Sequence, residues 1–220
     1  MTFKLLDVFA GMGGWSIGFY REGFECIGID LVDVGYPYRL VLADVKDYCP
    51  KEHFDVVVES PPCTEFSHLT MLSYKRGQRG PPDPDKGIQL VKEGIRIKDE
   101  VKPVYWVIEN VYGAIPYLQP LLGKPMLLAK PWVLWGNLPN FMFDFEPRRR
   151  GDTKMSHTFE HTGKGGDIFG KAGGRTGIPE DFAWDPLRSR KRARIPVFLS
   201  QVIAKVVKGE LTKYTAKEEF

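Results

Sequence analysis

Short apolar segments alternate with helix-patterned segments along the first half of the chain, and this alternation strongly constrains the fold. The apolar segments share strand-like lengths and are 3–9, 25–30, 40–43, 54–58 and 104–108. Segments 15–22 and 86–101 instead carry apolar residues at helical spacing. This order predicts an α/β fold with a mostly parallel twisted sheet and helices on both faces. In such sheets, ligands bind beyond the carboxyl ends of the strands.

The composition is that of an ordinary globular chain. Its 220 residues are 43% hydrophobic and 27% charged, with a net charge of +3, which argues against intrinsic disorder. No apolar run approaches the ~20 residues of a membrane span. The N-terminus lacks the pattern of a secretory signal. The three cysteines form no CxxC pair, and the four histidines lack ligand spacing. We therefore expect a cytoplasmic protein without membrane association, disulfides or a metal.

Basic residues gather in three clusters despite the small net charge. These clusters are 75–79, 148–150 and 188–194. Taken alone, they are as typical of a solvated surface as of contacts with a phosphate backbone.

Two long stretches interrupt the alternation of strands and helices. Segment 60–85 is rich in proline, glycine and charge, and segment 151–177 is rich in glycine. Loops of this length are usually either functional or disordered. Segment 195–207 then predicts a closing amphipathic helix with Pro196 in its first turn. We expect the charged tail 208–220 to be frayed.

A glycine-rich turn follows the first apolar segment, in the order Asp7-Val8-Phe9-Ala10-Gly11-Met12-Gly13-Gly14. Glycine adopts positive φ and lets the backbone approach a ligand closely. The spacing matches neither GxGxxG nor the Walker motif, and a simple tight turn remains an alternative. Asp30 ends the next apolar segment and suits ribose hydroxyls, while Asp44 is placed to meet an adenine amino group. Together these residues predict an adenosine-containing ligand.

A cysteine follows the most apolar segment, within Ser60-Pro61-Pro62-Cys63-Thr64-Glu65-Phe66-Ser67. A lone cysteine is usually an inert core residue, but two prolines here fix the backbone that presents the thiol. A nucleophilic cysteine also needs a lowered pKa or an electrophile that draws it in. Glu109 follows the next apolar segment, so the topology can bring it into one pocket with Cys63.

These motifs and their order resemble the DNA cytosine-5 methyltransferases. Members of that family typically show D-hydrophobic-F-A-G-x-G-G, then P-P-C-Q-x-F-S, then E-N-V. The resemblance covers roughly residues 3–145 and, more loosely, 188–207. It implies a Rossmann-like S-adenosylmethionine-dependent methyltransferase fold with S-adenosylhomocysteine as product. It also implies double-stranded DNA as the partner, methylated at carbon 5 of cytosine.

The resemblance implies a role for each matching position. Cys63 would attack carbon 6 of a flipped-out cytosine, and Glu109 would hold its ring nitrogen 3 and amino group. Arg148 or Arg150 would stand for the family's basic pair near the active site. Residues expected to bind the methyl donor are Phe9, Ala10, Gly11, Gly13, Gly14, Asp30, Leu31, Asp44, Val45 and Pro61. Residues expected to contact DNA are Ser67, Lys75, Arg76, Arg79, Arg190 and Arg192.

The chain departs from the family pattern at several positions. Thr64 replaces the usual glutamine, and Glu65 adds a negative charge near the expected DNA. The family's Q-R-R and G-N-S-V-P motifs have only loose counterparts. The segment between them is also short, so the compact form resembles phage- or virus-type enzymes.

The short segment sets the expected domain organisation. We expect a catalytic domain over 1–150 and 188–208, a small Gly-rich target-recognition segment over 151–187, and a charged tail over 209–220. A region this small predicts short or relaxed sequence specificity, or help from a homo-oligomer or an accessory partner.

Three other functions remain open at this point. A tRNA cytosine-5 methyltransferase would share the scaffold, although its usual Cys-Phe-Thr signature is not found. A non-catalytic protein that binds S-adenosylmethionine or DNA is a second possibility, against which intact Cys63 and Glu109 argue. The third is a related enzyme that uses another donor or a free nucleotide.

Overall fold

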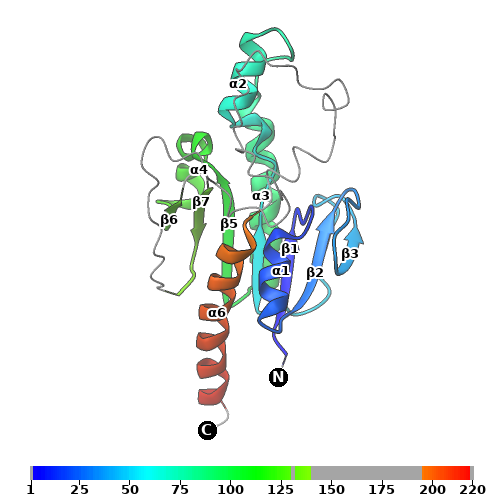
Figure 1. The fold of residues 1–220 in the computed structure, drawn as a ribbon, viewed down its shortest axis with the longest axis vertical. Helices are drawn as coiled ribbons and strands as arrows, with labels where there is room; N and C mark the ends of the chain where they lie inside the picture. The colour runs from blue at the N-terminus through cyan, green and yellow to red at the C-terminus, as the bar shows by residue number, and fades with distance from the viewer. Residues whose placement is uncertain (1, 130–131, 140–194, 219–220) are drawn as a thin grey trace, which may run out of the picture.

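The computed structural model describes residues 2–129, 132–139 and 195–218. Within them lies a seven-stranded sheet in the order β3-β2-β1-β4-β5-β7-β6 (Figure 1). Its strands are β1 (Lys4–Val8), β2 (Glu25–Asp30), β3 (Arg39–Leu42), β4 (Val56–Glu59), β5 (Tyr105–Val111), β6 (Leu127–Ala129) and β7 (Trp132–Gly136). Strands β1 to β5 pair in parallel, while β7 is antiparallel to both β5 and β6. The predicted α/β fold with a mostly parallel sheet is confirmed.

The central strands β1 and β4 are mostly apolar because helices cover both faces of the sheet. In β4, Val56 and Val58 belong to one buried cluster and Val57 to another, as the alternation of side chains along a strand requires. Leu5 and Leu6 of β1 divide between the same two clusters. Continuous valine and leucine runs are typical of parallel strands buried on both sides.

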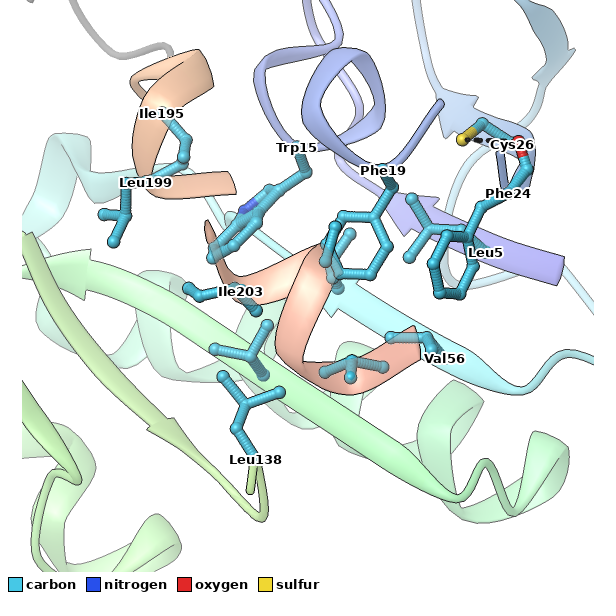
Figure 2. Packing of buried hydrophobic residues seen from close by; sticks show 14 of the residues in the cluster. Leu5, Trp15, Phe19, Phe24, Cys26, Val56, Leu138, Ile195, Leu199 and Ile203 are labelled. Carbon is cyan, nitrogen blue, oxygen red and sulfur yellow. Dashed lines mark hydrogen bonds between the residues drawn. The ribbon is translucent and has the colours of Figure 1, made fainter. Parts of the chain in front are cut away.

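One face of the sheet is covered by α1 (Gly14–Arg21) and α6 (Val197–Glu218), which are far apart in the sequence. Figure 2 shows Trp15 and Phe19 of α1 packed beside Leu199 and Ile203 of α6. The two helices approach closely at Gly18, where a Cβ would collide with Ser200 of α6. The last helix of the chain therefore holds the first helix against the sheet.

The other face carries α3 (Pro84–Val101), with α4 (Ile115–Leu122) beside it. Helix α3 begins after Asp83, whose side chain accepts a hydrogen bond from the Lys86 N–H, a common N-cap arrangement. Its C-cap residue Lys102 adopts a left-handed φ of 53° before Pro103. None of the helices in these described ranges is both long and apolar enough to cross a membrane.

Three expectations about the elements need correction. Segment 60–85 is not one loop, because it contains the turn η1 (Cys63–Glu65), α2 (His68–Lys75) and the start of α3. The closing helix does not fray after residue 207, since α6 runs to Glu218 and buries Leu211. Glu109 lies inside β5 rather than after it. The proposed recognition segment 151–187 lies outside the described residues, and the domain boundaries remain a prediction.

Candidate active site

The glycine-rich turn lies between β1 and α1 and has the left-handed backbone that its glycines predict. Phe9, Gly11 and Gly13 have φ values of 61°, 52° and 72°. The Gly13 N–H donates to the Ala10 carbonyl at 2.8 Å, which closes the turn just before α1. A Cβ at Gly13 would lie 2.8 Å from Pro37 Cδ. Glycine is therefore required at 13 by both conformation and space.

Asp30 joins this turn to the end of β2. Its Oδ2 accepts from the Gly11 N–H at 2.9 Å, and its Oδ1 accepts from the Val32 N–H at 3.2 Å. Each carboxylate oxygen can accept more than one hydrogen bond, so both retain capacity for a ribose hydroxyl. Leu31 and Leu42 lie at the same ends of β2 and β3, with 66% and 62% of their surface exposed.

The residues at this edge fit an adenosine group. Carboxylate acceptors at Asp30 suit sugar hydroxyls, and exposed apolar side chains suit an aromatic base. Asp44 follows β3, and its Oδ1 accepts from the Lys46 N–H at 3.0 Å, leaving acceptor capacity there too. The neighbouring Val45 is buried in the core.

A buried hydrogen-bond network supports the turn from below. Asp7 is 1% exposed, and its Oδ2 accepts from the Ser16 hydroxyl at 2.6 Å. The Ser16 oxygen lies 2.7 Å from the Tyr36 hydroxyl, and burial raises the pKa of Asp7 to about 7. Sequence reasoning missed Ser16 and Tyr36. One signal in the sequence could have indicated that a side chain lies close to β2, namely Gly28, a glycine inside a strand. A Cβ at this position would collide with the Tyr36 ring.

Cys63 begins η1, directly after β4 and its two prolines. Burial, and to a smaller extent the nearby Glu109 carboxylate, raise the pKa of its thiol to about 11. The thiol is therefore protonated in the free protein at neutral pH. Such a cysteine becomes nucleophilic only when the opposing charge is removed or an electrophile is bound.

Glu109 and Asn110 hold the segment that precedes the cysteine. Glu109 is 7% exposed; burial raises its pKa to about 7, and a hydrogen bond from Ser60 opposes that rise. Asn110 Nδ2 donates to the Pro61 carbonyl at 3.1 Å. The structure thus places Cys63 just after β4 and Glu109 near the end of the neighbouring strand β5, where a Glu109 charge opposes ionisation of the thiol.

Glu65 has a structural role that explains its unexpected charge. Its Oε2 lies 3.3 Å from Arg79 Nη2 and accepts from the Asp83 N–H at 2.9 Å. The following residue, Phe66, packs where Gly87 of α3 lacks a side chain. Glu65 therefore ties the cysteine turn to the start of α3, and it neutralises one of the arginines expected to contact DNA.

The remaining residues expected to contact DNA are only partly described. Lys75 ends α2 and Arg76 follows it, and both are exposed. Ser67 precedes α2 and is half-buried. Figure 1 shows α2 projecting from the body of the protein, at the end opposite to both termini. The four other predicted arginines lie outside the described residues and are Arg148, Arg150, Arg190 and Arg192.

Residues 2–129, 132–139 and 195–218 contain no group of three histidine, cysteine, aspartate or glutamate side chains that could hold an ion.

Comparisons with known proteins agree with this geometry. Residues 40–116, which include Cys63 and Glu109, match the model of the C-5 cytosine-specific DNA methylases. The type II methyltransferase M.AplI of Arthrospira platensis is 33% identical over 134 residues, which cover 54% of this chain and 36% of that protein. A probable DNA (cytosine-5)-methyltransferase of Frog virus 3 is 32% identical over 114 residues, which cover 49% of this chain and 53% of that protein.

A solved structure described as a DNA modification methyltransferase encoded within an E. coli prophage aligns with a TM-score of 0.40 and 23% identity, over 52% of this chain and 33% of its own. The aligned region thus spans a third to about half of the length of these relatives. The match over residues 40–116 includes the motifs of Cys63 and Glu109, whereas the glycine-rich turn precedes it. The chain is therefore related to the C-5 cytosine-specific DNA methylases.

Proposed function

We propose that the protein transfers a methyl group from S-adenosylmethionine to carbon 5 of cytosine in DNA. The observation that carries this proposal is the placement of Cys63 just after β4 and of the buried Glu109 carboxyl in the neighbouring strand β5, where it opposes ionisation of the thiol. The turn that suits an adenosine group lies at the end of β1, which pairs with β4. A nucleophile, a proton-holding group and a donor site are thus expected at one edge of the sheet.

Residues of the first three strand ends would hold the methyl donor. The backbone of Phe9 to Gly14 would surround its amino-acid part, with Asp30 accepting from the ribose. Leu31 would cover the adenine, while Asp44 and Val45 would meet its edge, and Pro61 would border the donor from β4. When bound, S-adenosylmethionine supplies an electrophilic methyl group; all other steps depend on the chain and the base.

Glu109 and Cys63 would act together on a flipped-out cytosine. Protonated Glu109 would hold ring nitrogen 3, which draws electrons from the ring and makes carbon 6 electrophilic. The same protonation removes the negative charge that opposes ionisation of Cys63. The thiol then gives its proton to water as Sγ bonds to carbon 6, and carbon 5 becomes electron-rich enough to take the methyl group. Loss of the carbon 5 proton to water and breaking of the Sγ–C6 bond restore the ring and the thiolate.

Two effects dominate the expected energetics of the reaction, namely alignment of the reacting groups and flipping of the base. Holding reacting groups in line can lower a barrier by about 7–11 kcal/mol, while flipping the base costs a few kcal/mol. Exposed Lys75 and Arg76 on the projecting α2 region would contact phosphates.

We further propose that the protein methylates DNA with short or relaxed sequence specificity. The alternative is that a second copy of the chain or an accessory partner supplies the recognition of sequence. The proposed compartment is the cytoplasm.

The test is methyl transfer from labelled S-adenosylmethionine to duplex DNA, single-stranded DNA and tRNA in parallel. We expect 5-methylcytosine in duplex DNA by nucleoside mass spectrometry, and none with Cys63→Ala. Cys49→Ala is the matched control, because Cys49 is a free and exposed cysteine that belongs to none of the motifs. Label found only in tRNA would favour an RNA enzyme. Donor binding without any transfer would favour a regulatory protein or a missing partner.

A further inference from the structure

We propose that Arg96 of α3 is a positioning residue for the methyl donor, because it fixes the turn that places the Asp44 carboxylate at the edge of the adenine. The inference rests on the proposed function, in which Asp44 accepts from the adenine amino group. It follows from hydrogen bonds that join α3 to backbone carbonyls just after Asp44.

The short turn after β3 sets the place of the Asp44 side chain. The Asp44 carbonyl accepts from the Asp47 N–H at 3.0 Å and from the Tyr48 N–H at 3.1 Å. The Asp44 carboxylate accepts from the Lys46 N–H at 3.0 Å through Oδ1. The carboxylate is thus tied to the backbone of residues 44–48, and it moves if that backbone moves.

Arg96 binds two backbone carbonyls of this turn. Its Nη2 donates to the Val45 carbonyl at 2.7 Å and to the Tyr48 carbonyl at 3.1 Å. An Nη nitrogen of arginine carries two hydrogens, so one nitrogen can bind both carbonyls at once. Because Val45 and Arg96 are 51 residues apart, these contacts join the turn to a different layer of the fold.

The guanidinium group of Arg96 is itself held in place by α3. Its Nε donates to Glu93 Oε2 at 2.9 Å, and its Nη1 donates to Glu100 Oε1 at 2.8 Å. All three nitrogens of the planar group therefore have partners, and the two glutamates orient Nη2 toward the turn. Lysine offers a single ammonium on a flexible stem, which cannot make this set of contacts.

The position of α3 distinguishes two ways in which a change at Arg96 could act. Helix α3 also meets the cysteine turn, since the N–H of its N-cap residue Asp83 donates to Glu65 at 2.9 Å. A change that disturbed α3 as a whole would reach Cys63 and slow methyl transfer itself. A change that acts through Asp44 alone weakens donor binding and leaves the rate at saturation unchanged.

The experiment measures binding of S-adenosylhomocysteine by calorimetry, beside an analogue in which hydrogen replaces the 6-amino group of the adenine. The variants are Arg96→Ala, Arg96→Lys and Asp44→Ala. Lys92→Ala is the matched control, because Lys92 is an exposed cation one turn earlier in α3. The KM for S-adenosylmethionine and kcat are measured for the same proteins, and hydrogen exchange of the Tyr48 amide reports on the turn itself.

Arg96→Ala should weaken binding of S-adenosylhomocysteine about tenfold, the size expected for one lost hydrogen bond to a charged acceptor. Binding of the analogue without the amino group should change by less than about twofold, because the contact that depends on Arg96 is already absent. Arg96→Lys should show a smaller loss of the same kind, and Asp44→Ala a loss as large as Arg96→Ala. For both Arg96 variants KM should rise while kcat stays unchanged, and the Tyr48 amide should exchange faster than in Lys92→Ala.

The inference is overturned if Arg96→Ala binds S-adenosylhomocysteine as the wild type does, if it loses as much affinity for the analogue, or if kcat falls with KM unchanged. A wild-type protein that binds neither ligand, or an Asp44→Ala variant that binds both unchanged, would instead contradict the proposed donor site. Hydrogen exchange then still decides, since equal rates at Tyr48 in Arg96→Ala and Lys92→Ala would show that Arg96 does not fix the turn.

Discussion

Glu59 of β4 and Gly94 of α3 fill one space between the sheet and the helix. A Cβ at position 94 would lie closer to the Glu59 carboxyl than the 3.0 Å that real Cβ atoms keep. Glu59 is buried, and neither of its carboxyl oxygens has a hydrogen-bond partner. A glycine in the middle of a helix costs stability, so the buried carboxyl explains why one is present.

Gly94→Ala should therefore destabilise the protein by about 1–3 kcal/mol, as overpacking does, although alanine favours a helix. Glu59→Ala removes the obstructing carboxyl, so the double variant should lose less than the sum of the two single changes. Urea unfolding of the four proteins measures this coupling. Strictly additive losses would show that the two residues do not share the space.

The buried carboxyl of Glu59 should also make stability depend on pH. Burial raises its pKa to about 8 from an unfolded value of 4.5. The folded state then holds a proton that the unfolded state releases, so stability is full below pH 4.5 and falls as pH rises toward 8.

Glu59→Gln removes this dependence. Its unfolding free energy relative to the wild type should rise by about 1.4 kcal/mol for each pH unit between those two values. Denaturant unfolding at pH 5, 6, 7 and 8 measures the difference. Parallel stability curves for the two proteins would contradict a proton held on Glu59.

Gly13 and Gly35 offer a matched pair for the glycine-rich turn. Both have positive φ, at 72° and 90°, but a Cβ at Gly13 would collide with Pro37 whereas nothing lies within 4 Å at Gly35. Each alanine should cost about 1–2 kcal/mol in backbone strain. Gly13→Ala should also displace the backbone that contacts S-adenosylmethionine. We expect this to weaken binding tenfold or more by calorimetry, which corresponds to a loss of about 1.4 kcal/mol of binding free energy. Equal effects on binding would contradict the assigned turn.

Arg79 should behave differently from Lys75 and Arg76 in DNA binding. Its guanidinium already pairs with Glu65, so a phosphate would have to displace that partner. Lys75→Ala and Arg76→Ala should each reduce the salt dependence of log K by about 0.9 for one lost phosphate contact. Arg79→Ala should change it less. Binding of a duplex measured across salt concentrations tests this, and an equal change in all three variants would contradict the pairing.

Most of the parallel strands could be predicted because they are runs of buried apolar residues, although β3 is not buried. The predicted segment 25–30 coincides with β2, and Cys63 follows β4 as expected, whereas Glu109 lies within the adjacent strand β5. The motifs were strong enough to indicate a resemblance to the C-5 cytosine-specific DNA methylases, and residues 40–116 match the model of that family.

Other features depend on tertiary contacts that leave little trace in the sequence. Trp15 and Ser60 are 45 residues apart, and no local pattern joins them. Helix α2 is only 8 residues long and lies among glycines and prolines. The closing helix continues past Gly209 because Leu211 is buried in the core, which only the packing against α1 and the sheet reveals.

The central claim is that Cys63 bonds to carbon 6 while carbon 5 accepts a methyl group. A duplex in which 5-fluorocytosine replaces the target cytosine tests it directly, because fluorine cannot leave carbon 5 as a proton does. With S-adenosylmethionine present, the account predicts a protein–DNA adduct that survives denaturing electrophoresis, with mass spectrometry placing the bond on Cys63. Cys49→Ala should form the same adduct. An adduct on another residue, or none from a protein that methylates ordinary DNA, would contradict the account.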